Sequence, residues 1–159
     1  MKYNRFEELP VWQAAIELAV LIFDLTSRPV FRRYYGLKDQ LERAGVSVSN
    51  NIAEEYERGT TQETLTFLYI AKGSCGEVRS LTYLLERLPA FNSLRTEILD
   101  IRSRATSISK QLRGWCNSLQ NTDIRGQRYI TDKTKRAAIA KREREEFLRE
   151  LAEMRNRRE

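Results

Sequence analysis

The sequence predicts an all-α protein, an antiparallel up-down-up-down four-helix bundle followed by a C-terminal helical tail. Three observations predict this fold. Four segments repeat apolar residues at spacings of three and four, short turn-forming links separate these segments, and no alternation typical of strands competes with them. A chain of 159 residues is long enough to bury a core of this kind.

The first helix is expected from about Pro10 to Thr26. Proline suits the first helical position, where its missing N–H costs nothing. Two apolar stripes run side by side along the segment, one of Val11, Ala15, Leu18, Ile22 and Leu25 and one of Trp12, Ile16, Ala19 and Phe23. So wide an apolar face predicts contacts with more than one neighbour. Pro29 then ends the segment, because it disfavours helical geometry at the residue before it.

The second helix is expected from about Gly36 to Arg58. Its apolar positions repeat at four and three, at Leu37, Leu41, Ala44, Val48, Ile52 and Tyr56. Gly59 is the predicted C-terminal cap, and Thr60 with Glu63 forms a predicted capping box for the next helix. So short a connection predicts that the second and third helices run antiparallel.

The third helix is expected to continue to about Leu88, where Pro89 stops it. Its main stripe is Phe67, Ala71, Ser74, Val78, Leu81, Leu85 and Leu88. Gly73 and Gly76 each cost about 1 kcal/mol of helix propensity. Such a cost indicates close approach by another backbone, with a local kink as the alternative.

The fourth helix has the most regular apolar pattern in the chain. Spacings of four and three alternate strictly through Leu94, Ile98, Ile101, Ala105, Ile108, Leu112, Trp115 and Leu119. Asn92 or Ser93 is the predicted N-cap. The predicted organisation is therefore a four-helix bundle over 1–120, a linker over 121–134 and a charged helical tail over 135–159.

Positive charge is concentrated towards the C-terminus. Residues 121–159 carry 12 Lys/Arg against 8 Asp/Glu, whereas residues 1–120 carry 16 against 14. The apolar stripe of the tail is thin, so the tail is marginal as an isolated helix and is expected to order against a partner or another subunit. A basic excess of this kind suits polyanions such as RNA or DNA.

The residues that catalysis usually needs are missing. The chain has no histidine, the commonest general base and metal ligand, and no phosphate-binding loop, metal-ligand spacing or nucleophile elbow. Cys75 and Cys116 both lie in helical patterns and are predicted to be small buried hydrophobes. We therefore predict a protein that is not an enzyme, with no catalytic residue, no metal and no cofactor.

No segment predicts a membrane or secretory role. The longest apolar candidate, residues 14–25, is interrupted by Glu17 and Asp24 and is too short to span a bilayer. The N-terminus has no apolar stretch of the kind that a secretory signal requires. A cytoplasmic location without a membrane partner is the prediction.

Cations recur at near-helical spacing on the last two helices. Arg95, Arg102 and Arg113 are predicted to share one solvent-facing side of the fourth helix, and Lys72, Arg79 and Arg87 form a similar row on the third. Such rows suit a phosphate backbone, which presents repeated negative charge. The candidate nucleic-acid-binding residues are these six together with Lys135 and Arg136 of the tail. An ordinary solvated surface is the alternative.

Three stretches carry a family resemblance. Residues 9–15 (LPVWQAA), 40–54 (QLERAGVSVSNNIAE) and 67–80 (FLYIAKGSCGEVRS) resemble the 23S ribosomal RNA intervening-sequence proteins, also called four-helix bundle proteins. The likeness covers about residues 6–120. The same family contains the accessory variability determinant of diversity-generating retroelements.

The resemblance implies a homopentamer of four-helix bundles with a basic surface. In retroelements such a pentamer partners the reverse transcriptase and its template RNA during mutagenic cDNA synthesis. The alternatives are a protein encoded by an intervening sequence, or a protein-binding scaffold with no direct nucleic-acid role. The chain departs from the family at Glu55, where glycine is usual, and in the tail, which exceeds the usual family length.

Three polar residues within the resemblance are candidates for an interface or a structural role. Asn51 and Glu54 lie beside apolar positions of the second helix, where they either contact RNA or another subunit, or belong to a hydrogen-bonded network that fixes helix ends or subunit register. The network is the favoured interpretation. Glu54 and Arg58 are spaced as an i,i+4 ion pair, which also favours a structural role.

Overall fold

The structure of the chain, a computed structural model, describes residues 3–58 and 61–120. Several predictions concern residues outside this description. They are the cap at Gly59, the capping box of Thr60 with the Glu63 side chain, the linker 121–134, and the tail 135–159 with Lys135 and Arg136. Four α-helices are described, α1 (Pro10–Thr26), α2 (Tyr35–Arg58), α3 (Thr61–Arg87) and α4 (Arg95–Gln120), with three 3₁₀ helices, η1 (Phe6–Glu8), η2 (Pro29–Arg32) and η3 (Pro89–Leu94).

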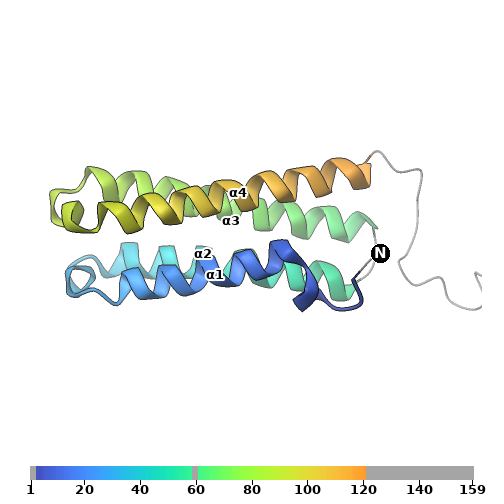
Figure 1. Ribbon diagram of the computed structural model, residues 1–159, viewed down its shortest axis with the longest axis horizontal. Coiled ribbons are helices and arrows are strands. Elements are labelled where there is room, and N and C mark those ends of the chain that lie inside the picture. The colour runs from blue at the N-terminus through green and yellow to red at the C-terminus, as the bar shows by residue number, and fades with distance from the viewer. Residues whose placement is uncertain (1–2, 59–60, 121–159) are drawn as a thin grey trace, which may run out of the picture. The chain divides into compact units, whose positions relative to one another are not determined.

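The four long helices form an antiparallel bundle, as predicted. Each packs against the next along the chain, and α4 returns to pack against α1, so α1 and α3 lie diagonally across the bundle. Figure 1 shows the α1–α2 and α3–α4 connections together at one end. Within the described residues all regular secondary structure is helical. None of the described helices combines the length and the apolar character needed to cross a membrane.

The predicted helix boundaries hold except at the start of α4. Helix α1 has the predicted bounds, α2 begins one residue early, and α3 ends at Arg87, just before the extended residue that precedes Pro89. The predicted N-cap at Asn92 or Ser93 is wrong. Both residues lie inside η3, because Pro89 starts a 3₁₀ helix that runs directly into α4 at Arg95.

One continuous core fills the bundle. The first α1 stripe is buried as predicted, and so are the α4 positions Ile98, Ile101, Ala105, Ile108 and Leu112. The second α1 stripe is divided. Ala19 is buried, whereas Ile16 and Phe23 are 37% and 47% exposed. The bundle therefore leaves part of its predicted apolar face uncovered.

Two phenylalanines close the end of the bundle that holds the α1–α2 and α3–α4 connections. Phe31 comes from η2 and Phe91 from η3, and each is only 1% exposed. Their ring centroids are 4.9 Å apart at 62°, an edge-to-face contact, and the ring of Tyr34 lies 5.1 Å from that of Phe91. These rings extend the core past the ends of the long helices.

The glycine that permits close helix approach is Gly45, not the two singled out on α3. A Cβ atom at Gly45 would lie 2.7 Å from Cδ1 of Ile22, so α1 and α2 pack closely there. A Cβ at Gly73 would meet nothing within 4 Å, and one at Gly76 would only reach the Arg79 side chain at 4.0 Å. The expected close approach at Gly73 and Gly76 is therefore wrong within this chain.

Candidate nucleic-acid interface

Charge divides the bundle into two halves. Helices α1 and α2 together carry 3 Lys/Arg against 7 Asp/Glu, a balance of −4. Helices α3 and α4 carry 8 against 5, a balance of +3. Because each pair is adjacent in the bundle, the acidic and basic residues gather on different sides. The α3–α4 side is the one whose charge attracts a polyanion.

The groove between α3 and α4 brings most of the two predicted cation rows together. At about 100° per residue, Lys72 and Arg79 lie on one flank of α3, and Arg95, Arg102 and Arg113 lie on one flank of α4. Arg102 contacts Thr82 and Tyr83 of α3, so the α4 flank faces α3. Arg87 is turned about 80° from Arg79 and is exposed away from this row. The α3–α4 groove is defined here by these two flanks.

Arg102 does not face solvent, contrary to the prediction. Its side chain is 13% exposed and its Nη2 lies 2.6 Å from Oε2 of Glu86. Nη2 also donates to the Thr82 carbonyl at 3.0 Å, and Nε donates to the Thr82 hydroxyl at 3.3 Å. The guanidinium carbon is 3.7 Å from the ring centroid of Tyr83. Arg102 is thus a clamp between α3 and α4, and its charge is already matched by Glu86.

The lowered pKa of Glu86 makes the stability of this contact between α3 and α4 depend on pH. The hydrogen bond from Arg102 is the largest cause that lowers the pKa of Glu86, and the charges of Arg102, Arg95 and Arg87 lower it further, while burial opposes them. A carboxyl whose pKa is lowered by folding stabilises the folded state above its ordinary pKa. That stabilisation disappears as the pH falls through the lowered value.

Glu86→Gln is therefore expected to melt several degrees below the wild type at neutral pH, with the difference closing under acid conditions. Thermal unfolding followed by circular dichroism across the acid range measures this gap. Glu77→Gln, at an exposed carboxylate in the middle of α3, is the control and should follow the wild type throughout. A gap for Glu86→Gln that stays constant with pH would contradict the ion-pair explanation.

Two exposed tyrosines border the groove and were not predicted as site residues. Nζ of Lys72 lies 5.8 Å from the ring centroid of Tyr69, and Nε2 of Gln120 donates a hydrogen bond to the Tyr69 hydroxyl at 2.9 Å. Tyr83 carries the Arg102 guanidinium over its ring. The sequence signal was present, because Tyr69, Lys72, Gly76, Arg79 and Tyr83 alternate spacings of three and four on α3.

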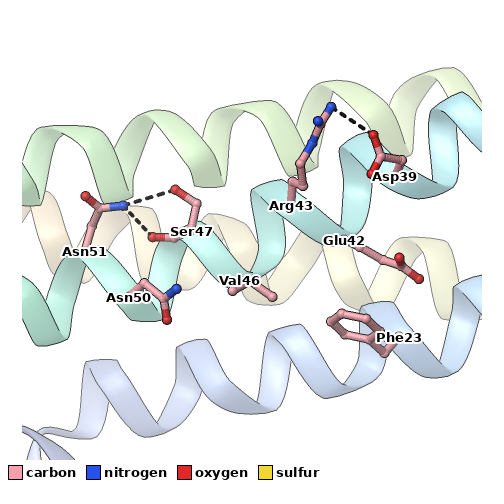
Figure 2. Close-up of a pocket in the computed structure, with 8 residues that line it drawn as sticks. All are labelled: Phe23, Asp39, Glu42, Arg43, Val46, Ser47, Asn50 and Asn51. Atoms are coloured by element: carbon pink, nitrogen blue, oxygen red, sulfur yellow. Dashed lines mark hydrogen bonds and ion pairs between the residues drawn. The ribbon is translucent and has the colours of Figure 1, made fainter.

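The polar candidates on α2 make their side-chain hydrogen bonds and ion pair within that helix. Asn51 Nδ2 donates to the Ser47 carbonyl at 2.7 Å and to the Ser47 hydroxyl at 3.1 Å, as Figure 2 shows. Ser74 of α3 donates to the same Ser47 hydroxyl at 2.8 Å, which links α2 to α3. Glu54 and Arg58 form their i,i+4 ion pair at 2.7 Å. Asn51 is therefore hydrogen-bonded to the residue that links α2 to α3, whereas Glu54 forms an exposed ion pair within α2.

A shallow hollow on the acidic side of the bundle has different chemistry. It is lined by the apolar residues Phe23 of α1 and Val46 of α2 and by polar and charged residues of α2, namely Asp39, Glu42, Arg43, Ser47, Asn50 and Asn51 (Figure 2). Beside it, Ile16 and Val20 extend the exposed part of α1. Apolar side chains bordered by acidic and amide groups suit a protein surface better than a phosphate backbone.

Neither cysteine is arranged for chemistry. Both are buried, and burial raises the pKa of the Cys75 thiol to about 12, so it stays protonated near neutral pH. Burial also raises the pKa of Cys116. Among the described residues, no group of three or more His, Cys, Asp and Glu side chains is placed to hold a metal ion.

Glu55, the residue that departs from the family pattern, lies inside the bundle. Its side chain is completely buried on α2, so the position contributes no exposed surface in this chain. Its charge is the smallest of the causes that raise the pKa of Cys116, while Lys72 acts in the opposite direction. The carboxyl therefore lies in the same part of the bundle as the C-terminal half of α4.

The bundle matches one known family. The family model of the 23S rRNA-intervening sequence protein aligns with residues 7–114, about two thirds of the chain. The matched stretch includes the acidic hollow and nearly the whole α3–α4 groove, and it ends before the tail. No curated protein matches the chain.

Proposed function

The chain belongs to the 23S rRNA-intervening sequence protein family, and from this premise we propose that it is an RNA-associated accessory protein. In this proposal the protein is not an enzyme, and it works in the cytoplasm as a homo-oligomer. The observation that carries the proposal is the α3–α4 groove. Its helices hold a balance of +3, while the other helix pair is acidic. The groove offers cations at helical spacing, of which Arg95 and Arg102 are ion-paired with Glu86.

The proposed contact is with the sugar–phosphate backbone. Lys72, Arg79 and Arg113 have no ion pair with any residue that the structure describes, unlike Arg102. Cations without a protein counter-charge release ions from a nucleic acid when they bind it, which makes the affinity depend on salt. Repeated contacts of this kind position a strand without reading its sequence.

Fluorescence anisotropy of a labelled RNA at increasing salt tests the proposal. Three engaged cations predict that the logarithm of the binding constant falls with the logarithm of salt concentration with a slope of about −2 or steeper. A variant with Lys135→Gln and Arg136→Gln tests the two candidate residues of the tail and should keep most of the affinity. Absence of binding at low salt would remove the RNA part of the proposal.

Self-association is supported by uncovered apolar side chains on two helices. Ile16, Val20 and Phe23 lie on α1, while Ile70 and Leu84, 45% and 43% exposed, lie on the diagonally opposite α3. Different apolar side chains on opposite sides of the bundle suit a head-to-tail interface, which closes into a ring when the rotation allows. The number of five subunits comes from the family resemblance. Native mass spectrometry should give a pentamer, and a monomer at micromolar concentration would contradict it.

The partner that we propose is a retroelement reverse transcriptase with its template RNA, again from the resemblance. The acidic hollow of Figure 2 supports the alternative of a protein-binding scaffold, because its chemistry suits a protein surface. Affinity capture with and without nuclease separates the two. A protein partner that survives nuclease and high salt, from a chain that binds no RNA, would favour the scaffold. A template repeat and a reverse transcriptase gene beside this gene would support the retroelement role.

A further inference from the structure

The two tyrosines of the α3–α4 groove are exposed although they are aromatic. Tyr69 is 46% exposed and Tyr83 is 52% exposed. They are 14 residues apart on α3, which places them about 21 Å from one another along the helix axis. Large aromatic surface left in water is costly, so its repetition along a cation-lined groove points to a ligand with aromatic groups.

Each ring is already held in place by neighbouring side chains. The Arg102 guanidinium covers one side of the Tyr83 ring at 3.7 Å, and Arg102 is itself fixed by Glu86 and Thr82. The Tyr69 hydroxyl accepts a hydrogen bond from Gln120, and Lys72 lies within 5.8 Å of the ring centroid. A ring that is fixed before binding loses little conformational entropy when a second flat group stacks on it.

We propose that the α3–α4 groove binds unpaired RNA, with bases stacking on Tyr69 and Tyr83 while Lys72 and Arg79 contact the phosphates between them. This inference rests on the proposed function and adds the class of RNA that the groove accepts. Aromatic platforms joined by cations are a general solution for single strands, because every base has a face that can stack. A duplex already stacks its bases internally and offers the rings no free face.

The surface between the tyrosines suits a strand that lies close to the helix. Gly76 lies midway between them, and a Cβ added there would meet only the Arg79 guanidinium at 4.0 Å. The Nε atom of Arg79 is buried and lacks a hydrogen-bond partner among the described residues, which leaves an unmet donor beside the groove. The positive balance of α3 and α4 favours a nucleic acid over a protein partner with an apolar face.

The test compares a short unstructured RNA with an RNA duplex of the same length, both labelled, against the full chain. Replacing both tyrosines, Tyr69→Leu with Tyr83→Leu, keeps apolar bulk and helix propensity but removes the rings. Stacking contributes about 1–3 kcal/mol per base, equivalent to about fivefold or more for each ring. We therefore expect the double variant to bind the single strand at least about 20-fold more weakly and the duplex as the wild type does.

Two controls keep the result specific. The paired change to phenylalanine retains both rings and should retain single-strand affinity. Tyr35→Leu removes a tyrosine that is 71% exposed at the start of α2 and should change neither affinity. Circular dichroism establishes that each variant is folded before its affinity is compared.

The outcomes separate this inference from the function on which it rests. A wild-type chain that binds neither RNA at low salt overturns both. Equal binding of single strand and duplex, unaffected by the leucine changes, overturns only the stacking inference and leaves a backbone-binding groove. Leucine variants that bind RNA normally but change the oligomer mass would also overturn it, because the tyrosines would then be protein contacts.

Discussion

Replacing Phe91 with alanine is expected to lower the free energy of unfolding by about 3–5 kcal/mol, the usual cost of removing a fully buried aromatic ring. Phe91 is 1% exposed and lies against Phe31 and Tyr34, at the end of the bundle that holds the α1–α2 and α3–α4 connections. The cavity would lie between short 3₁₀ helices whose bounds are set by Pro29 and Pro89, so the surrounding chain has little freedom to collapse into it.

Urea unfolding at a fixed protein concentration measures this loss, and Tyr35→Ala is the matched control. Tyr35 is 71% exposed, so its truncation should change stability by about 0.5 kcal/mol or less. A double-mutant cycle with Phe31→Ala should give a coupling of about 0.5–1.5 kcal/mol for the edge-to-face contact. A loss below about 1 kcal/mol for Phe91→Ala would mean that these rings do not seal the core.

The helical bundle could be predicted because apolar periodicity records which side of a helix is buried. On α4 the alternation of four and three follows the core side directly, and Ile98, Ile101, Ala105, Ile108 and Leu112 are all buried. On α1 the same pattern was broader than the core. Ile16 and Phe23 have the same helical spacing as the buried residues but are exposed. Periodicity alone does not distinguish an apolar residue of the core from one on an exposed apolar surface.

Whether each cation in the groove is ion-paired could not be predicted from its spacing in the sequence. Arg95, Arg102 and Arg113 share one flank of α4, as their separation requires. Whether a cation on that flank forms an ion pair depends on the neighbouring helix. Arg102 is paired because Glu86 of α3, 16 residues before it in the sequence, lies opposite it. Likewise, Gly45 differs from Gly73 only because Ile22 of another helix lies opposite it.

Reversing two groove charges, Lys72→Glu with Arg113→Glu, is expected to weaken RNA binding about tenfold or more near 0.1 M salt. Lys72 lies on α3 and Arg113 on the facing flank of α4, and neither forms an ion pair within the described part of the chain. Each lost phosphate contact should also make the salt slope shallower by about 0.7–0.9, so the slope and the affinity must change together.

The control carries the same change in net charge on the acidic half of the bundle. Lys38→Glu with Arg43→Glu removes two cations of α2 that are already paired, with Glu42 at 3.7 Å and Asp39 at 3.0 Å. If the α3–α4 groove binds the RNA, the Lys38→Glu, Arg43→Glu variant should have only slightly lower affinity and an unchanged salt slope. If both double variants weaken RNA binding equally, the attraction comes from the total charge of the protein and the groove is not the binding site. Because the two variants have the same net charge, only the location of the cations can separate them.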